Sequence, residues 1–171
     1  YLTIKDYDRE FKIYRLGFPN KEVENGFIKY LLPLYTPIEE NKSEFYIANF
    51  VSDIERGNPD GFMERLQSLF ADSDYKITGK MEKYFQNSMY LIFKMMGFFT
   101  EVERTTSRGR MDIVMKTKDY IYVMELKLDG TADEALRQIE DKGYAEPFKT
   151  DGRQIYKIGV SFSSETRGIE E

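Results

Sequence analysis

The sequence of 171 residues contains no histidine and no cysteine. These absences exclude disulfide frameworks, zinc sites built from Cys and His, and haem held by either residue. They also exclude Ser-His-Asp and Cys-His catalysis within this chain. Any chemistry must therefore use carboxylates, Lys, Arg, Tyr or hydroxyl groups. Any metal must be a hard cation held through oxygen, such as Mg²⁺ or Mn²⁺.

Long apolar runs are missing as well. The most apolar stretch, Met89 to Phe99, is interrupted by Lys94 and is shorter than the roughly 20 residues that a membrane span needs. No segment resembles a targeting signal, so we expect a cytoplasmic protein without a membrane partner. Because the chain begins with Tyr1 rather than Met, we also expect it to be a fragment of a longer protein.

What is present is enough apolar material for a core: 41% of the residues are hydrophobic and 15% are aromatic. We expect a division near residue 78, with a small, mostly helical module at 1–77 and a second domain at 78–171. In the first part, Asn20 is a candidate N-cap, and Pro33 and Pro37 are expected to stop the helix that it begins. The elements expected there are strands at Tyr1–Tyr7 and Glu10–Leu16 and helices at Lys21–Leu32, Ser43–Arg56 and Pro59–Phe70. No catalytic constellation is visible in this part.

The second part has the order α-β-β-β-α-β, which predicts an α/β sandwich and not a doubly wound nucleotide fold. Its second helix carries a capping box, with Thr131 as N-cap and Glu134 three residues later, and Gly143 closes it. The other elements expected are a helix at Gly79–Met96 and strands at Phe98–Arg104, Arg110–Lys116, Tyr120–Leu128 and Gln154–Phe162.

Two carboxylates and a lysine come close together if the strands expected at Arg110–Lys116 and Tyr120–Leu128 form a hairpin. Strand alternation puts Glu125 and Lys127 on the same face as two apolar residues. With Lys118-Asp119 as a two-residue loop, Asp112 lies directly opposite Glu125, about 4.5–5.5 Å away at Cβ. Lys118-Asp119 is not a favoured tight-turn pair, and a register shifted by two would still keep all three residues on one face.

Such a face is core-directed, and charges on it must be paired or bound to a metal. Two neighbouring carboxylates repel each other unless a cation lies between them. A cation held by two carboxylates, with a fixed ammonium beside it, suits metal-assisted phosphodiester hydrolysis. The alternative is an ordinary strand-end salt bridge in which Lys127 neutralises Asp112 and Glu125.

These residues resemble a known signature. Gly109-Arg110-Met111-Asp112, followed by Glu125-Leu126-Lys127, is similar to the GR-(hydrophobic)-D … (E/D)-x-K pattern of the PD-(D/E)XK nuclease superfamily. Gln138 to Tyr144 resembles the Gln…Tyr motif of RecB-like members. Residues 79–171 resemble the C-terminal nuclease domain of bacterial proteins, common in gut Bacteroidetes, that carry an upstream AAA-type ATPase-like region. Residues 9–23 resemble the segment that joins the two regions.

The resemblance implies an α/β, restriction-endonuclease-like α-β-β-β-α-β core and a set of site residues. Asp112, Glu125 and the Leu126 carbonyl would hold Mg²⁺ or Mn²⁺, and Lys127 would be the catalytic lysine. The remaining residues of the implied site are Gln138 and Tyr144, which would line it, and Glu82, the match for an additional acid on the first core helix.

Each of the last three residues also has an ordinary reading. Glu82 suits the N-terminal turn of a helix because of the helix dipole. Gln138 could be a solvated helix position, and Tyr144 could pack behind the helix end.

The sequence departs from the family pattern in one respect, because the leading Pro of the nominal motif is absent. The upstream ATPase is not part of this chain: Gly79-Lys80-Met81 lacks the G-x-x-x-x-G-K-[ST] loop, so no phosphate cradle exists here.

The implied function is a Mg²⁺-dependent nuclease acting on DNA, with RNA as the second choice of substrate. The net charge of −5 is unusual for a nucleic-acid binder. A local basic patch near the acids would compensate for it, and its candidates are Arg104, Arg108, Arg110, Lys116 and Lys118. Two alternatives remain open at this point: an inactive nuclease-like fold that binds nucleic acid or protein, and an interaction module that couples an upstream ATPase-like domain to the nuclease-like part.

Overall fold

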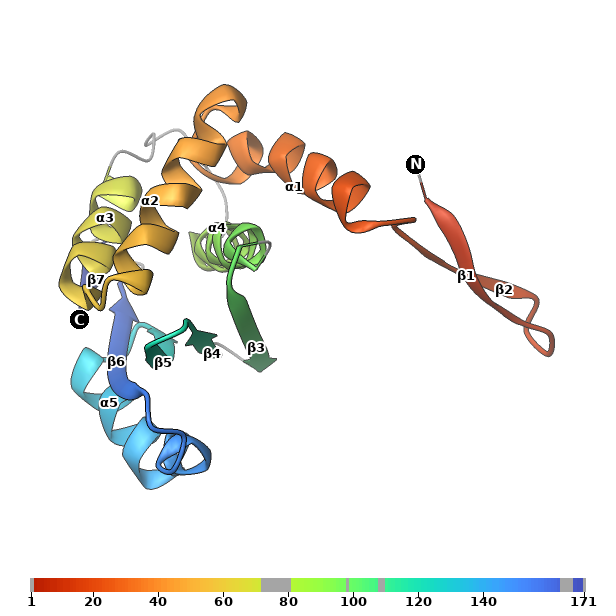
Figure 1. The fold of residues 1–171 in the computed structure, drawn as a ribbon. Helices are drawn as coiled ribbons and strands as arrows, with labels where there is room; N and C mark the ends of the chain where they lie inside the picture. The colour runs from red at the N-terminus through yellow and green to blue at the C-terminus, as the bar shows by residue number, and fades with distance from the viewer. Residues whose placement is uncertain (1, 72–80, 98, 108–109, 164–167, 171) are drawn as a thin grey trace.

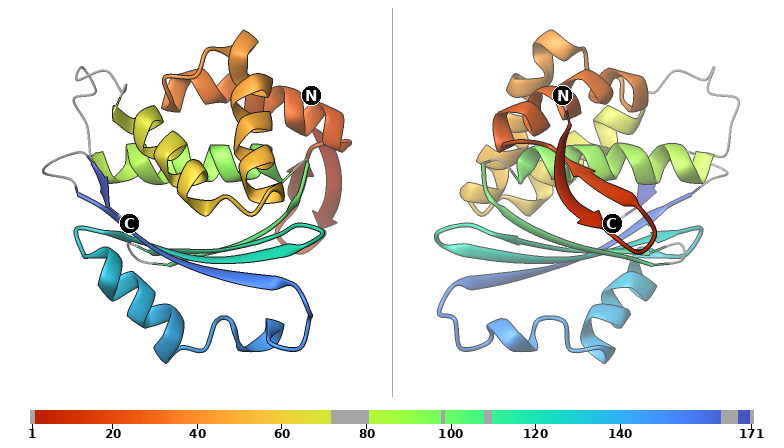
Figure 2. Two further views of the ribbon diagram at one scale, coloured as in Figure 1. Left: turned by 60° about the vertical axis from the view of Figure 1, so that its left-hand side comes forward. Right: turned by 90° about the vertical axis from the view of Figure 1, so that its right-hand side faces the viewer.

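The computed structural model describes residues 2–71, 81–97, 99–107, 110–163 and 168–170. Within these ranges, the side chains of residues 81–83, 86, 103–112 and 170 fall outside the description. The chain has an α/β fold consistent with the expected restriction-endonuclease-like core. A mixed sheet lies between a layer of four helices and a single helix on its other face (Figure 2).

The sheet has five strands in the order β3-β4-β5-β6-β7. The first three form an antiparallel meander, β6 pairs parallel with β5, and β7 pairs antiparallel with β6. Three strands have the expected bounds: β4 (Arg110–Lys116), β5 (Tyr120–Leu128) and β6 (Gln154–Phe162). The short β7 (Ile169–Glu170) was not expected.

The expected bounds of β3 were wrong. This strand covers Glu101–Ser107 rather than Phe98–Arg104. The reason is the end of the preceding helix: the backbone N–H groups of Phe99 and Thr100 both donate to the Met96 carbonyl, so the chain is still turning there. Gly97 also donates to Phe93. The strand can begin only after these helix-end carbonyls have been satisfied.

Helices α1 (Lys21–Tyr35), α2 (Ser43–Glu55), α3 (Pro59–Ala71) and α4 (Met81–Met96) lie on one face of the sheet, and α5 (Ala132–Asp141) lies on the other (Figure 2). Two short 3-10 turns follow α1 and α5, at Glu40–Lys42 and Glu146–Phe148. Among the described residues, no helix combines the length and apolarity needed to cross a membrane.

Proline does not stop α1, contrary to expectation. The helix continues through Pro33 to Tyr35, and the Thr36 N–H donates to the Leu32 carbonyl at 2.9 Å. The Thr36 hydroxyl donates to the same carbonyl at 2.8 Å. Leu32 is fully buried. Tertiary packing on this side of the helix therefore offsets the hydrogen bond that proline removes.

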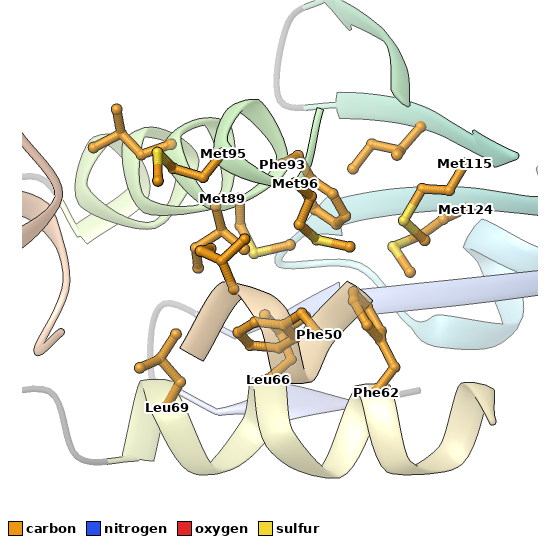
Figure 3. Close-up of a cluster of buried hydrophobic side chains, with 14 of the residues drawn as sticks. Phe50, Phe62, Leu66, Leu69, Met89, Phe93, Met95, Met96, Met115 and Met124 are labelled. Atoms are coloured by element: carbon orange, nitrogen blue, oxygen red, sulfur yellow. The ribbon is translucent and has the colours of Figure 1, made fainter. Parts of the chain in front are cut away.

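The main core lies between the four-helix layer and the sheet. Figure 3 shows aromatic residues of α2 and α3 facing the methionines of α4 and of the strands. Fully buried members of this cluster include Phe50, Phe62, Met89, Met115 and Tyr122. Because one cluster joins all four helices to the sheet, the helical part and the strands share a hydrophobic core. The division expected near residue 78 falls in 72–80, outside the described residues, and stays a prediction.

Tyrosines of the sheet hold the α2–α3 turn. The Tyr122 hydroxyl donates to the Ile54 carbonyl at 2.7 Å, and the Tyr156 hydroxyl donates to the Gly57 carbonyl at 3.2 Å. Gly57 has φ +70°, and a Cβ there would lie 2.5 Å from the Tyr120 ring. Glycine is required at this turn both by its left-handed backbone and by the close approach of the ring.

The N-terminal hairpin extends away from this body (Figure 1). It consists of β1 (Thr3–Asp8) and β2 (Ile13–Gly17), an antiparallel pair with Tyr7 opposite Tyr14. The hairpin was expected, although its strands begin two and three residues later than predicted. Nearly all of its side chains are exposed.

Candidate active site

The two faces of β5 have different partners. Tyr122, Met124 and Leu126 belong to the main core. Ile121 and Val123 belong to a second cluster that includes Ile139 of α5 and Ala145. The alternation continues to Glu125 and Lys127, which therefore lie on the face that α5 covers.

Glu125 is a fully buried carboxylate. Its Oε1 atom accepts a hydrogen bond from Nε2 of Gln138, with 2.5 Å between the two atoms. The Oε2 atom is also shielded from solvent. Burying an ionised carboxylate raises the free energy of the folded state unless opposite charge or hydrogen bonds compensate it. Buried carboxylates of this kind are typical of functional sites.

Asp112 occupies the expected position in the sheet. The register of β4 and β5 pairs Asp112 with Glu125, and residues 118 and 119 form the tip of the hairpin. The backbone N–H of Thr117 donates to the Tyr120 carbonyl at 2.9 Å and closes the turn. This is the register that the sequence predicted. The side chain of Asp112 lies outside the described residues, so its distance from Glu125 stays a prediction.

Lys127 lies two residues after Glu125 and is half-buried. Its register partners are Arg110 on β4 and Ser161 on β6. A Cβ at Gly130 would lie 3.2 Å from Cδ of Lys127 and 3.3 Å from its Cβ. The aliphatic stem of the lysine therefore lies against the turn that leads into α5.

Helix α5 presents Gln138 to Glu125 because its start is well defined. The Thr131 hydroxyl accepts from the Glu134 N–H, and the Glu134 carboxylate accepts from the Thr131 N–H, both at 3.1 Å. This is the capping box that the sequence predicted. Ala135 and Ile139 face the sheet and are buried. Gln138, next to Ile139, is only partly buried and reaches Glu125 from the helix side.

Two other expected site residues have positions that leave their roles untested. Tyr144 packs against the second cluster, with Ile121 and Val123, and its N–H donates to the Ile139 carbonyl. Glu82 is the second residue of α4, and its side chain lies outside the described residues. Helix α4 belongs to the layer on the opposite face of the sheet from α5 (Figure 2). The roles of both residues stay predictions.

Two residues of this region were not recognised from the sequence: Gly159 and Ser161 on β6. Their register partners are Glu125 and Lys127. A Cβ at Gly159 would lie 2.3 Å from the Ala132 carbonyl oxygen, and the Ser161 hydroxyl donates to the Gly130 carbonyl at 2.8 Å. A glycine within an apolar strand often marks a close backbone approach, and this was the available signal.

The donor set fits a hard divalent cation. Glu125 supplies a buried carboxylate, and the register places a second acidic residue opposite it on the neighbouring strand. Oxygen ligands of this kind suit Mg²⁺ and Mn²⁺. Among the residues whose side chains are described, no three acidic groups gather into a metal site. The side chain of Asp112, the expected second ligand, lies outside that search.

The expected basic patch is only partly described. Lys116 forms an ion pair with Glu101 at 2.9 Å, and its Nζ lies 5.5 Å from the centroid of the Phe148 ring. Lys118 at the hairpin tip is exposed. The three candidate arginines have side chains outside the described residues. The patch therefore stays a prediction.

Comparison with known proteins gives two results. The sequence model of the PD-(D/E)XK nuclease superfamily matches residues 80–171, more than half of the chain. An uncharacterized protein from the vnfD 5′ region of Azotobacter chroococcum mcd 1 is 28% identical over 182 residues. The match covers 99% of this chain and 34% of that protein, so the chain spans about a third of this relative's length. No solved structure gives a significant match.

Proposed function

Because the chain belongs to the PD-(D/E)XK nuclease superfamily, we propose that it is a divalent-metal-dependent nuclease that hydrolyses phosphodiester bonds in DNA, with RNA as the second candidate substrate. The observation that carries the proposal is the buried Glu125, paired in register with Asp112 and hydrogen-bonded to Gln138. Glu125 and Asp112 are the proposed metal ligands, together with the Leu126 carbonyl, and Mg²⁺ or Mn²⁺ is the proposed ion.

Each residue has a role that its position supports. A bound divalent cation would supply positive charge that polarises the phosphate and acidifies the attacking water. Glu125 is held in one orientation by Gln138 because a charge-assisted hydrogen bond fixes its Oε1 atom. Lys127, with its stem against Gly130, is proposed to direct its ammonium toward the negative charge that develops on the phosphate oxygens. Glu82 and Tyr144 are retained as weaker candidates for the additional acid and the RecB-like tyrosine.

Cleavage assays test the proposal. Purified protein with Mg²⁺ or Mn²⁺ is expected to cleave at least one of linear, circular and single-stranded DNA or RNA. Asp112→Asn, Glu125→Gln and Lys127→Met should each lower the rate by about 100-fold or more, since each removes a ligand or a charge from the transition state. Glu140→Gln is the matched control, because Glu140 is an exposed acid on α5 that pairs with Lys157.

The proposal fails if wild-type protein cleaves none of these substrates with either ion. It also fails if cleavage persists in Asp112→Ala at the wild-type rate. Calorimetric titration with Mn²⁺ tests the metal site independently of any substrate, because the proposed enzyme requires an ion at Asp112 and Glu125 and an inactive scaffold does not.

The second candidate function is a binding module, and the exposed apolar surface of the N-terminal region favours it. Ile4, Tyr7, Tyr14 and Leu16 are all at least 41% exposed, and the register pairs Ile4 with Leu16 and Tyr7 with Tyr14. An isolated two-stranded hairpin with such a face is marginal in water. We propose that it packs against an upstream ATPase-like region of a longer, cytoplasmic protein. Hydrogen exchange should then show the hairpin amides protected in the longer protein and not in residues 1–171 alone.

A further inference from the structure

Strand β6 carries a pair of small residues directly beside the proposed catalytic strand. In the parallel register Gly159 pairs with Glu125, and Ser161 pairs with Lys127. Gly159 and Ser161 are both buried. Neither has a charged side chain, and the Ser161 hydroxyl is engaged by the backbone carbonyl of Gly130.

Gly159 is the point where the start of α5 meets the sheet. A Cβ at this position would lie 2.3 Å from the Ala132 carbonyl oxygen, 2.6 Å from the Leu136 nitrogen and 3.0 Å from the Leu136 Cβ. Real Cβ atoms essentially never approach other heavy atoms closer than 3.0 Å. Two of these three atoms belong to the helix backbone, which no rotamer change can move. Any side chain at residue 159 therefore displaces the first turns of α5 away from β6.

Ser161 holds the turn that precedes the helix. Its hydroxyl donates to the Gly130 carbonyl at 2.8 Å, and the Asp129 N–H donates to the Phe162 carbonyl at 2.8 Å. Asp129 has φ +52°, a left-handed backbone that is uncommon outside glycine. The turn is thus tied to β6 on one side while Gly130 rests against the stem of Lys127 on the other.

We propose that Gly159 and Ser161 are positioning residues: they clamp the start of α5 to β6 and thereby place the Gln138 amide on the Glu125 carboxylate. Gln138 lies six residues after Ala132 on one short helix, so a shift at the first turn is transmitted to it. A displacement of α5 away from β6 would lengthen the contact between Gln138 Nε2 and Glu125 Oε1, which is 2.5 Å here. The use of this contact in metal binding rests on the proposed nuclease function, whereas the positioning itself does not.

The side-chain amide of Gln138 reports the clamp directly. Its ¹⁵N–¹H resonances are assigned from their loss in Gln138→Ala, and the effect of the carboxylate is calibrated by Glu125→Gln. In metal-free protein, Gly159→Ala and Ser161→Ala should each shift the Gln138 resonances toward their positions in Glu125→Gln. Ser161→Thr, which keeps the hydroxyl, should restore the wild-type positions or come close to them.

Matched controls separate this effect from a general loss of stability. Ser88→Ala removes another buried hydroxyl, which lies against the Tyr35 carbonyl of α1 and the Tyr84 carbonyl of α4, away from the site. Gly26→Ala adds a methyl group on α1 where, apart from the chain neighbours and the helix's own backbone, no heavy atom lies within 4 Å of the new Cβ. Both should leave the Gln138 resonances unchanged. If Gly159→Ala does not fold, Ser161→Ala decides the matter, because it removes a single hydroxyl. Unchanged Gln138 resonances in folded Ser161→Ala overturn the proposal.

A second measurement links the clamp to the ion. If the proposed function holds, the dissociation constant for Mn²⁺ should rise about tenfold in Ser161→Ala, as is typical when the support of a ligand is lost. Wild-type protein that binds no Mn²⁺ contradicts the metal site but leaves the Gln138 shift as an independent test. If Ser161→Ala shifts the Gln138 resonances but leaves the Mn²⁺ affinity unchanged, Gly159 and Ser161 position Gln138 without affecting ion binding. That result overturns their role in the metal site.

Discussion

Among single residues, Glu125 shows most clearly how function and folding oppose each other. A leucine at this position would bury apolar surface at no electrostatic cost, whereas a buried carboxylate must be desolvated. Gln138 compensates part of this cost with a charge-assisted hydrogen bond. A sequence selected only for stability would not place Glu125 at the end of an apolar strand face. Its presence there is the residue-scale argument for chemistry.

Tyr122 gives a prediction about pH. Burial, followed by the neighbouring Tyr156, Tyr120 and Asp53, raises the pKa of its phenol above the ordinary value of 10.0. The neutral phenol, which donates to the Ile54 carbonyl, is therefore favoured in the folded state. Its contribution to stability is fully present below pH 10 and is lost as the pH rises through and beyond that value.

Tyr122→Phe should consequently lower the free energy of unfolding by about 1 kcal/mol at pH 7, the typical net value of a buried hydrogen bond. Between pH 9.5 and 11 the variant should lose less stability than wild type. Urea unfolding across this range measures both effects. Tyr30→Phe, on an exposed side chain, should change nothing at pH 7. Parallel stability curves for wild type and Tyr122→Phe would contradict the prediction.

At the scale of elements, α5 is the most clearly encoded helix and the one that reaches the site. It is a short helix of ten residues, so its ends contribute a large share of its stability. Thr131 and Glu134 satisfy one orphan N–H group each. The same helix carries Gln138. The capping box at the start of α5 and the contact of Gln138 with Glu125 are therefore coupled, because α5 is short and moves as a unit.

Thr131→Ala should lower the free energy of unfolding by about 1 kcal/mol, the usual cost of an N-cap deletion. Glu134→Ala should be destabilising too. The double variant should cost less than the sum of the single ones, because the two side chains act as one reciprocal unit. Denaturant unfolding of all three proteins measures the difference. If the two single effects add strictly, the capping box does not act as a unit. Glu146→Ala serves as the control, because Glu146 is an exposed acid beyond the helix.

For the whole molecule, the shared core predicts cooperative unfolding. Phe62 of α3 is fully buried and packs against Phe50 of α2 and Phe93 of α4. Phe62→Ala should lower the free energy of unfolding by about 3–5 kcal/mol. Because the cluster also includes residues of β4 and β5, helices and sheet should melt together.

The measurement follows helical ellipticity and hydrogen exchange of the β5 amides under increasing denaturant. Coincident transitions are expected, both displaced to lower denaturant in Phe62→Ala. Phe45→Ala is the matched control, since Phe45 lies on α2 but is 70% exposed. Two separate transitions, with only the helical one displaced, would support independent domains at 1–77 and 78–171 instead.

Prediction from the sequence was most accurate where local signals and periodicity agree. The bounds of β4, β5 and β6 and the capping box of α5 were correct, because strand alternation and cap chemistry are local properties. The end of α1 and the start of β3 were wrong. Pro33 is tolerated because the buried side of α1 packs on the core, and β3 starts late because the end of α4 uses the residues before it.

The sequence by itself determined the chemical possibilities of this protein: oxygen chemistry without histidine or cysteine, and two acids with a lysine spaced for neighbouring strands. It also placed Asp112, Glu125 and Lys127 on one face of a hairpin in either of two registers, and the structure has the one that pairs Asp112 with Glu125. The resemblance already placed Gln138 among the site residues, but only the tertiary structure decided that its amide donates to Glu125 and that Gly159 and Ser161 lie beside the site. Those contacts join separate elements. They depend on how closely α5 approaches the sheet, which no local pattern specifies.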